Sequence, residues 1–596
     1  MARVHPRRCG TPRTHHLGSH LTLPVDAGAA RYNNRDPVFH SSRFAMSLSD
    51  RFQTHVVYNQ PAPLADYDAF ATDPALQQAL EREGGGWARA EVAAFGPVVG
   101  GELLRLGFAA NAHVPEFRPF DARGHRINAV EFHPSYHRIM QLGIEHGVPN
   151  FDYRHPGKPG AVVARAALAY LHMQPEQGNN CPLTMTHAAV PALRHQRSLA
   201  REWEPRIIAP HYDGRDIPAQ AKAGNTIGMG MTEKQGGTDV RANSTRALPL
   251  GSTGPGEAYE LVGHKFFFSA PMCDAFLVLA QAKGGLSCFL MPRFLPDGAR
   301  NHFRIERLKD KQGDRSNASS EIEFTGAIGW LIGEEGRGVA NILEMVALTR
   351  QDCMLGSAGI MRQALVQAIH HCRQRRVFGK PLIEQPLMRN VLADLALESE
   401  AAMVLALRVA RALDAAERDP MEAAFARIAT AIGKYHVCKR CPPMVTEAQE
   451  CLGGPGYIED SILPRLYRQA PVNSIWEGSG NVQCLDMLRA LQREPATREA
   501  IVAELRSVAG ESALLDQEVR RIDAALSDPA TLEPRARRVI ERTALALQAV
   551  QLLRSGQGDV AGAFIDSRLG ADGFQCLGTL PESTPLERLI ERAFPA

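Results

Sequence analysis

The stretch YELVGHKFFFSAPMCDAFLVLAQAKGGLSCFLMP, residues 259–292, decides the fold class of this chain. It consists of short apolar or alternating runs that are broken by Gly, Pro and Asp, and none of these runs has the length of an ordinary helix. Two further runs of the same kind follow, FRIERLKD and SSEIEFTGAIGWLIG. Such runs in succession predict a compact β domain over residues 224–332.

Helical periodicity lies on both sides of this β domain. Residues 46–223 repeat apolar residues at three- and four-residue intervals, which predicts an N-terminal helical domain. Residues 333–492 contain longer amphipathic segments typical of a helical bundle, and residues 493–596 predict an additional C-terminal helical region. The predicted fold is therefore α+β, mostly α. Residues 1–45 superficially resemble a transit peptide, but the favoured interpretation is a disordered leader ahead of a start at Met46.

The composition limits the function classes. The 596 residues include 67 Lys and Arg against 65 Asp and Glu, a balance that is not typical of nucleic-acid or membrane-surface proteins. The 11 scattered cysteines indicate a reduced, cytoplasmic chain. Cys438 and Cys441 have the spacing of a redox or zinc motif, but without a second pair we interpret them as incidental thiols on a helix and expect no metal. No uninterrupted apolar run approaches the ~18–20 residues of a membrane span, so we expect no membrane partner.

A glycine-containing loop stands at the start of the β domain. In GMGMTEKQGGTDVRANST, residues 228–245, Gly236 and Gly237 allow the backbone to come close to a ligand, and Thr232 and Thr238 offer hydroxyl and N–H groups. An ordinary polar turn explains the same residues equally well. The loop lacks the G-x-G-x-x-G pattern, so a Rossmann-type site is not indicated.

Two further motifs combine aromatic and polar residues. GHKFFFSAP, residues 263–271, places rings on both faces of a strand, which suits either a fully buried strand or a wall beside a flat cofactor that Ser269 orients. RRVFGK, residues 375–380, follows a long helix. It is either a basic helix end or the source of a guanidinium, Arg375, for a pyrophosphate and a ring, Phe378, that packs on the ligand.

The last two motifs lie near the end of the predicted bundle. LGGPGY, residues 452–457, forms a permissive glycine loop. In PVNSIWEGSGNVQCL, residues 471–485, Glu477 lies between Trp476 and Gly478. A partly desolvated carboxylate at this place has a raised pKa, as a general base requires. The alternative is a capping carboxylate at the start of a helix.

Together these motifs resemble those of the acyl-CoA dehydrogenase family, which occur in the same order as L-T-E-x-x-x-G-S-D, K-x-W-I-T-N, R-x-x-F-G-K, L-G-G-x-G and Y-E-G-T. The resemblance covers about residues 52–490. MTEKQGGTDV, GHKFFFS and PVNSIWEGSGN are similar to one branch, the AidB-like proteins, which also carry an additional helical C-terminal region. The resemblance implies the fold of that family, non-covalent FAD and a homotetramer.

The resemblance also implies roles for individual residues. Glu477 matches the catalytic base, Phe267 stands where the family has a Trp against the flavin ring, and Ser269 stands where it has a Thr bonding near N5. Arg375 and Phe378 match contacts to the FAD of a neighbouring subunit. The predicted cofactor-binding set is Met231, Thr232, Gly237, Thr238, Phe267, Phe268, Ser269, Arg375, Phe378, Gly453, Gly454, Trp476, Ser479 and Asn481.

Three positions depart from the family pattern. Pro386 and Glu450 each stand where the family has a Gln. The family Gln at the position of Glu450 helps to bind the adenine-side diphosphate. The contacts to the FAD tail are therefore less well supported than the site of the flavin ring. Some members carry their base on a different helix, one residue before Arg350; that position is Thr349 here, which leaves Glu477 as the predicted base.

The implied reaction is α,β-dehydrogenation of an acyl thioester, either an acyl-CoA or a related small molecule. An acyl-CoA oxidase suits the length but matches the motifs less closely. The AidB-like branch implies another alternative, a flavoprotein that binds double-stranded DNA in the alkylation-damage response and has weak or vestigial dehydrogenase activity. Residues 493–596 contain 13 Arg and no Lys against 16 Asp and Glu, so their composition does not favour DNA binding. Their dense basic stretch is Arg535, Arg537, Arg538 and Arg542.

Overall fold

The structure, a computed structural model, describes residues 52–528, 531–570 and 576–595. The predicted leader at residues 1–45 lies outside the described residues. Residues 1–58 and 59–596 are separate units, and every element below belongs to the second unit.

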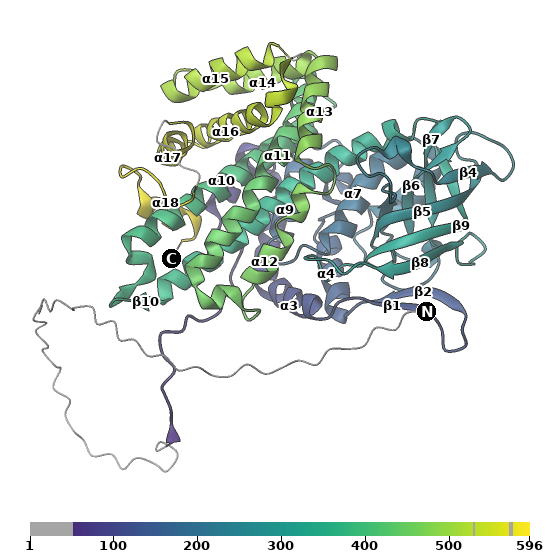
Figure 1. Cartoon of the computed structure of the whole chain (residues 1–596), viewed down its shortest axis with the longest axis horizontal. Coiled ribbons are helices and arrows are strands. Elements are labelled where there is room, and N and C mark those ends of the chain that lie inside the picture. The colour runs from purple at the N-terminus through teal and green to yellow at the C-terminus, as the bar shows by residue number, and fades with distance from the viewer. Residues whose placement is uncertain (1–51, 529–530, 571–575, 596) are drawn as a thin grey trace, which may run out of the picture. The chain divides into compact units, whose positions relative to one another are not determined.

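The N-terminal part of this unit is helical (Figure 1). Its helices are α1 (Pro74–Arg82), α2 (Arg89–Val98), α3 (Leu104–Ala112), α4 (Pro134–Glu145), α5 (Phe151–Arg154), α6 (Ala161–His172), α7 (Asn180–Arg194) and α8 (Arg197–Ile207). A hairpin of β1 (Glu116–Phe120) and β2 (Arg126–Glu131), which the helical periodicity did not predict, separates α3 from α4. Its turn is fixed by the Asp121 carboxylate, which accepts the N–H groups of Arg123 and His125.

The helical stretch Gly86–Ala112 has a mean hydropathy of 1.3, so by length and composition it could span a membrane. Half of its most apolar window (50%) is buried inside the fold. Val92, Phe95 and Leu103 from this stretch belong to the main helical core. Burial in a globular core therefore accounts for its apolar composition.

The β domain is a seven-stranded sheet in the order β3-β6-β4-β5-β9-β7, with β8 paired to β9. Its strands are β3 (Ile227–Gly230), β4 (Arg246–Pro249), β5 (Ala258–Ser269), β6 (Ala275–Ala282), β7 (Gly285–Pro292), β8 (Phe303–Leu308) and β9 (Ser319–Ile332). Because β6 also pairs with β7, the path from β6 through β4, β5 and β9 to β7 closes on itself. The antiparallel β5–β9 pair places Ser269 opposite Ser319 at one end of the sheet.

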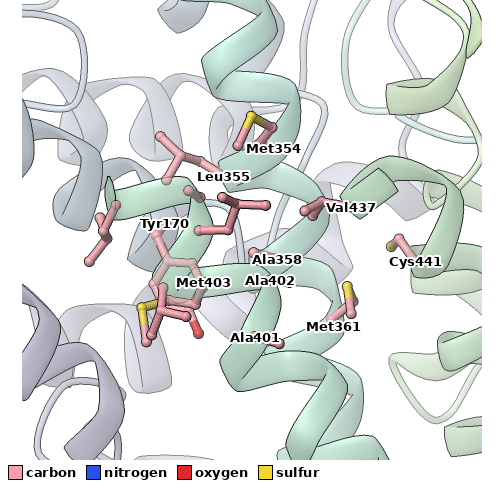
Figure 2. Packing of buried hydrophobic residues seen from close by; sticks show 14 of the residues in the cluster. Tyr170, Met354, Leu355, Ala358, Met361, Ala401, Ala402, Met403, Val437 and Cys441 are labelled. Carbon is pink, nitrogen blue, oxygen red and sulfur yellow. The ribbon is translucent and has the colours of Figure 1, made fainter. Parts of the chain in front are cut away.

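Long helices form the C-terminal bundle. They are α9 (Gly338–Gln374), α10 (Pro386–Ala415) and α11 (Pro420–Leu452), followed by the shorter α12 (Leu463–Gln469) and α13 (Gly480–Arg493). Figure 2 shows buried hydrophobic side chains, among them alanines and sulfur-containing residues, at which α9, α10, α11 and α6 pack together: Tyr170, Met354, Leu355, Ala358, Met361, Ala401, Ala402, Met403, Val437 and Cys441. Cys438 and Cys441 both lie on α11 and are buried.

The additional C-terminal region is helical and packs on this bundle, near α10, α11 and α13 (Figure 1). It consists of α14 (Ala496–Arg506), α15 (Ala513–Leu526), α16 (Ala536–Arg554), α17 (Gly558–Leu569) and α18 (Leu586–Ala593). Arg408 of α10 donates to Glu504 of α14 at 2.9 Å and to Glu422 of α11 at 2.7 Å, which ties the region to the bundle. The predicted fold class, α+β and mostly α, is confirmed.

Candidate active site

A buried ion pair fixes the loop that precedes β4. Glu233, 1% exposed, accepts the Nζ of Lys265 on β5 at 2.8 Å, together with the N–H and hydroxyl groups of Ser244 and Thr245. Burial works in the opposite direction, but the Lys265 ammonium and these hydrogen bonds hold the pKa of Glu233 well below its usual range. The loop that contains Thr232, Gly237 and Thr238 is therefore anchored to β5 by a carboxylate.

The three phenylalanines at the end of β5 have different environments. Phe266 donates its N–H to the Thr232 carbonyl at 2.8 Å, which joins the loop to the strand. Phe267 is 47% exposed, beside the Lys309 ammonium at 4.5 Å from its ring centre. Phe268 is fully buried against Phe276, so its side chain belongs to the core of the β domain. Alternation along the strand turns this side chain away from Phe267, so the cofactor contact predicted for Phe268 stays a prediction that the side chain itself does not support.

Ser269 lies between two other elements. Its hydroxyl is 2.9 Å from that of Ser319 on β9. Cys181, at the start of α7, lies within hydrogen-bond reach of Ser269 and close enough to Glu477 for an electrostatic interaction. The structure therefore brings the predicted orienting hydroxyl and the predicted base to one site. Burial raises the pKa of the Cys181 thiol to about 11, so the thiol is protonated at neutral pH.

Glu477 stands in a left-handed backbone conformation, with φ of 58°. Such a φ is unfavourable for a residue with a side chain and persists where contacts with the surrounding structure hold the backbone in place. Three side chains do so here by donating to carbonyl oxygens: Arg350 to Glu477 at 3.0 Å, Lys434 to Trp476 and Gly478 at 2.7 Å each, and Gln483 to Gly478 at 2.8 Å.

The carboxylate of Glu477 has an environment suited to a base. Burial raises its pKa, and the charges of Arg350 and Lys434 and a hydrogen bond from Thr349 act against this rise. Thr349 is the position at which some family members carry their base. The structure thus places the two alternative positions for the base next to each other, with the carboxylate of Glu477 at one and the hydroxyl of Thr349 at the other.

The residues after Glu477 begin α13 and meet the additional C-terminal region. Ser479 and Asn481 are exposed at the start of this helix. Arg537 of α16 donates to the Tyr435 hydroxyl at 3.2 Å and to the Asn481 side-chain carbonyl at 3.5 Å. One of the arginines predicted to bind DNA therefore lies at a predicted cofactor residue, which the sequence did not indicate.

The other three arginines have separate environments. Arg542 forms an ion pair with Glu518 of α15 and is therefore engaged within the fold. Arg535 donates to the Thr531 hydroxyl at 3.1 Å. Arg535 and Arg538 are exposed, and within the described residues neither forms an ion pair with a carboxylate.

The RRVFGK motif forms a short hairpin of β10 (Arg376–Val377) and β11 (Lys380–Pro381). Its turn has positive φ at Phe378 and Gly379, and the Phe378 side chain is 98% exposed. Figure 1 shows β10 at the end of the bundle remote from the β domain. The structure therefore does not bring Arg375 and Phe378 to Ser269 and Glu477 within one chain.

The glycine loop after α11 is also exposed. Gly453 has φ of 65°, and a Cβ at Gly453 or Gly454 would meet no atom within 4 Å. Trp476 is partly buried and donates its indole N–H to Asn473 at 3.0 Å. Met231 is partly buried and its carbonyl accepts from Asn243 at 2.8 Å.

The side chains at this site fit a flat cofactor with polar edges. Phe267 leaves aromatic surface uncovered at the end of an otherwise buried strand. Beside the Glu477 turn, Asn473 Nδ2 and Gln483 Oε1 are buried and make no hydrogen bond within the described residues. An isoalloxazine ring offers apolar faces and polar edges, which suit these groups.

Four residues at this site were not among the predicted site residues. Tertiary packing sets their contacts: Glu233 pairs with Lys265, Lys434 donates to the Trp476 carbonyl, and Cys181 lies beside Ser269. Glu233 and Lys265 do lie within recognised motifs, so a buried partner for each could have been sought there. Lys434 and Cys181 stand in ordinary helical segments that offered no such indication.

Family models match most of the chain. Residues 59–214 match the N-terminal domain of the adaptive response protein AidB, residues 228–327 the middle domain of acyl-CoA dehydrogenases, and residues 336–492 their C-terminal domain. These matches agree with the order of helical, β and helical parts in the structure.

Individual relatives agree with the family models. The putative acyl-CoA dehydrogenase AidB of Escherichia coli is 47% identical over 88% of this chain and 96% of its own length. Acyl-CoA dehydrogenase family member 11 of Caenorhabditis elegans is 30% identical over 79% of this chain and 78% of its own length. The solved structure of the latter protein in complex with C11-CoA superposes with a TM-score of 0.79, covering 93% of this chain and 100% of that chain at 27% identity. The chain belongs to the acyl-CoA dehydrogenase family of FAD-dependent oxidoreductases, and within it to the AidB-like branch.

Proposed function

We propose that the protein catalyses α,β-dehydrogenation of an acyl-CoA, with Glu477 as the base that removes the α proton. The observation that supports this most directly is the Glu477 turn, a carboxylate in a strained conformation whose pKa burial raises. FAD, when bound, supplies the acceptor for the hydride that leaves the β carbon. The product then carries a carbon–carbon double bond next to the thioester, and the proton remains on Glu477.

The surroundings of Glu477 adapt it to this task. Its raised pKa makes it a stronger base than an exposed glutamate. The nearby Arg350 and Lys434 charges act against the rise and so favour the ionised form of the carboxylate, which a base requires. Both cations also hold carbonyl groups of the turn, so the carboxylate is positioned before the reaction.

The C. elegans relative suggests a substrate for the test, because its solved structure contains C11-CoA. We expect acyl-CoAs of similar chain length to bleach the flavin of this protein fastest under anaerobic conditions. The experiment mixes the FAD-loaded protein with short-, medium- and long-chain acyl-CoAs and follows the flavin absorbance. Bleaching by none of them would refute the proposed reaction.

We also propose that the FAD site is completed across a subunit boundary in a homotetramer. The motivating observation is the exposed Phe378 on a hairpin remote from the other motif residues. Phe378→Ser is expected to weaken FAD binding by about tenfold or more, the effect of losing an aromatic anchor at an interface. Equilibrium binding of FAD and the assembly mass by light scattering measure the result.

The control for this substitution is Leu248→Ser on β4, where the native side chain is 50% exposed. It removes exposed apolar surface outside the predicted motifs and is expected to leave FAD affinity unchanged. A wild-type monomer that retains FAD would contradict the proposal.

A second candidate function is binding of double-stranded DNA in a cytoplasmic response to alkylation damage. The match to the adaptive response protein AidB suggests it, and Arg535 and Arg538, which are exposed, are the candidate phosphate contacts on this chain. These side chains are available to phosphates, whereas Arg542 is paired with Glu518.

Replacing both Arg535 and Arg538 with Ala is expected to weaken binding similarly for unrelated duplexes. The slope of log K against log salt should fall by about one unit per lost phosphate contact. FAD content should stay unchanged in this double variant, whereas Arg537→Ala should lower it, because Arg537 contacts Asn481. An unaltered salt slope in the double variant would show that Arg535 and Arg538 do not contact DNA phosphates.

A further inference from the structure

A directed hydrogen-bond chain leads from a lysine in the β8–β9 loop to Ser269. The Nζ of Lys311 lies 3.2 Å from the hydroxyl of Ser319, and this hydroxyl lies 2.9 Å from that of Ser269. Ser269 and Ser319 are paired residues on the neighbouring strands β5 and β9, so the sheet itself sets the distance between their hydroxyls. None of the predicted cofactor roles involves Lys311 or Ser319.

Lys311 is held in place within its own loop. Its Nζ also donates to the Asn317 carbonyl at 2.8 Å. Burial lowers the pKa of Lys311, and the charged or titratable groups that face it, Asp314, Cys181 and Glu176, act against this fall and favour the ammonium form. Burial raises the pKa of Asp314 to about 7, and the Cys181 thiol is protonated at neutral pH, so neither is a full counter-charge there. Glu176 is fully buried and accepts the N–H groups of Gly178 and Asn179.

The chemistry of an ammonium fixes the direction of this chain. A lysine ammonium has three N–H donors and no acceptor, so it donates to Ser319 and occupies a lone pair of that hydroxyl. The Ser319 proton is then free to point to Ser269, the nearest acceptor. Ser269 accepts from Ser319, which leaves its own O–H group to donate to the Cys181 sulfur or, in its place, to a ligand. Without the cation, either serine could act as the donor.

We propose that Lys311 is a positioning residue which, through Ser319, holds the Ser269 hydroxyl as a hydrogen-bond donor to the flavin edge. The inference rests on the proposed function and on the predicted place of Ser269 beside the flavin. A fixed donor stabilises the negative charge that the cofactor gains on reduction, so the chain makes two-electron reduction more favourable. Lys311 itself touches no reacting atom in this account.

The test measures the midpoint potential and visible spectrum of bound FAD in the full-length protein. Lys311→Met is expected to lower the equilibrium constant for two-electron reduction about tenfold, which is about 30 mV. Ser319→Ala, which removes only a hydroxyl, is expected to change the potential in the same direction and guards against misfolding of the lysine variant. Arg315→Met is the matched control, since it removes an exposed cation from the same loop, and should leave the potential unchanged.

A Ser269→Ala background separates this inference from the proposed function. If Lys311 acts through the hydroxyl chain, Lys311→Met should change the equilibrium constant for two-electron reduction less than about twofold in that background. An undiminished effect would mean that Lys311 acts through space and would overturn the inference. An unchanged potential in both Lys311→Met and Ser319→Ala would also overturn it. A Ser269→Ala variant with native spectrum and potential would instead refute the placement of the flavin beside Ser269, and so the proposed site itself.

Discussion

Replacing Glu477 with Gln is expected to slow flavin bleaching by an acyl-CoA by about 10²–10⁴-fold, the usual cost of losing a general base. Gln has the same length and can occupy the same backbone conformation, with φ of 58°, so the turn and FAD binding should be retained. The measurements are the anaerobic rate of bleaching by stopped flow and the FAD content by absorbance.

The pH dependence of the wild-type rate provides an independent measurement. Glu477 must be ionised to accept a proton, and burial raises its pKa above the ordinary value of 4.5. The rate should therefore rise with pH through a midpoint above that value, and this limb should be absent from the residual activity of Glu477→Gln. The same raised pKa means that the folded state loses stability relative to the unfolded state as pH rises from 4.5 through the folded pKa.

The control is Glu499→Gln, which neutralises an exposed carboxylate on α14 and should leave the rate and its pH profile unchanged. A Glu477→Gln variant that bleaches at the wild-type rate would show that Glu477 only shapes the turn. Loss of FAD from that variant would show that Glu477 also has a structural role. The proposed reaction assigns the carboxylate to proton removal and not to FAD binding.

Periodicity predicts the layers of this fold but not every element in them. The alternation of short strands and long helices is a local property, and it predicted the β domain and the bundle correctly. The β1–β2 hairpin was missed because its strands are short and their residues, with one exception, are exposed or only partly buried, so neither face carries a continuous apolar pattern. The predicted domain boundaries stay predictions, since within the described residues elements on both sides of the boundaries at 223/224, 332/333 and 492/493 pack together.

At the site, too, local sequence patterns predicted some features, but contacts between distant segments could not be predicted. A run of three phenylalanines indicated a special strand end, but only the register of β5 with β9 shows that Phe268 enters the core. The contact of Arg537 with Asn481 joins residues 56 positions apart, whereas the resemblance to the AidB-like branch had suggested DNA binding for this arginine. Side-chain partners from distant segments depend on tertiary packing, which a single sequence does not specify.

The Glu233–Lys265 pair is the most deeply buried link between the predicted flavin motifs. Both side chains are 0% exposed, and Lys265 also donates to the Leu279 carbonyl at 2.8 Å. Removing one member of such a pair leaves the other charge buried without compensation, which typically costs about 3–5 kcal/mol. The loop of Thr232 and Thr238 would also lose its anchor to β5. We therefore expect one substitution here to affect both stability and cofactor binding.

Glu233→Gln is expected to lower the free energy of unfolding by about 3–5 kcal/mol and to release FAD, as measured by denaturant unfolding and by flavin content. Lys265→Met in the same chain should recover part of the stability, because it removes the unpaired charge, but should not restore the loop. Glu306→Gln on β8, where the carboxylate is exposed, is the matched control and should change neither quantity. A Glu233→Gln variant with native stability would mean that the hydrogen bonds of Ser244 and Thr245, rather than the charge, hold this loop on the sheet.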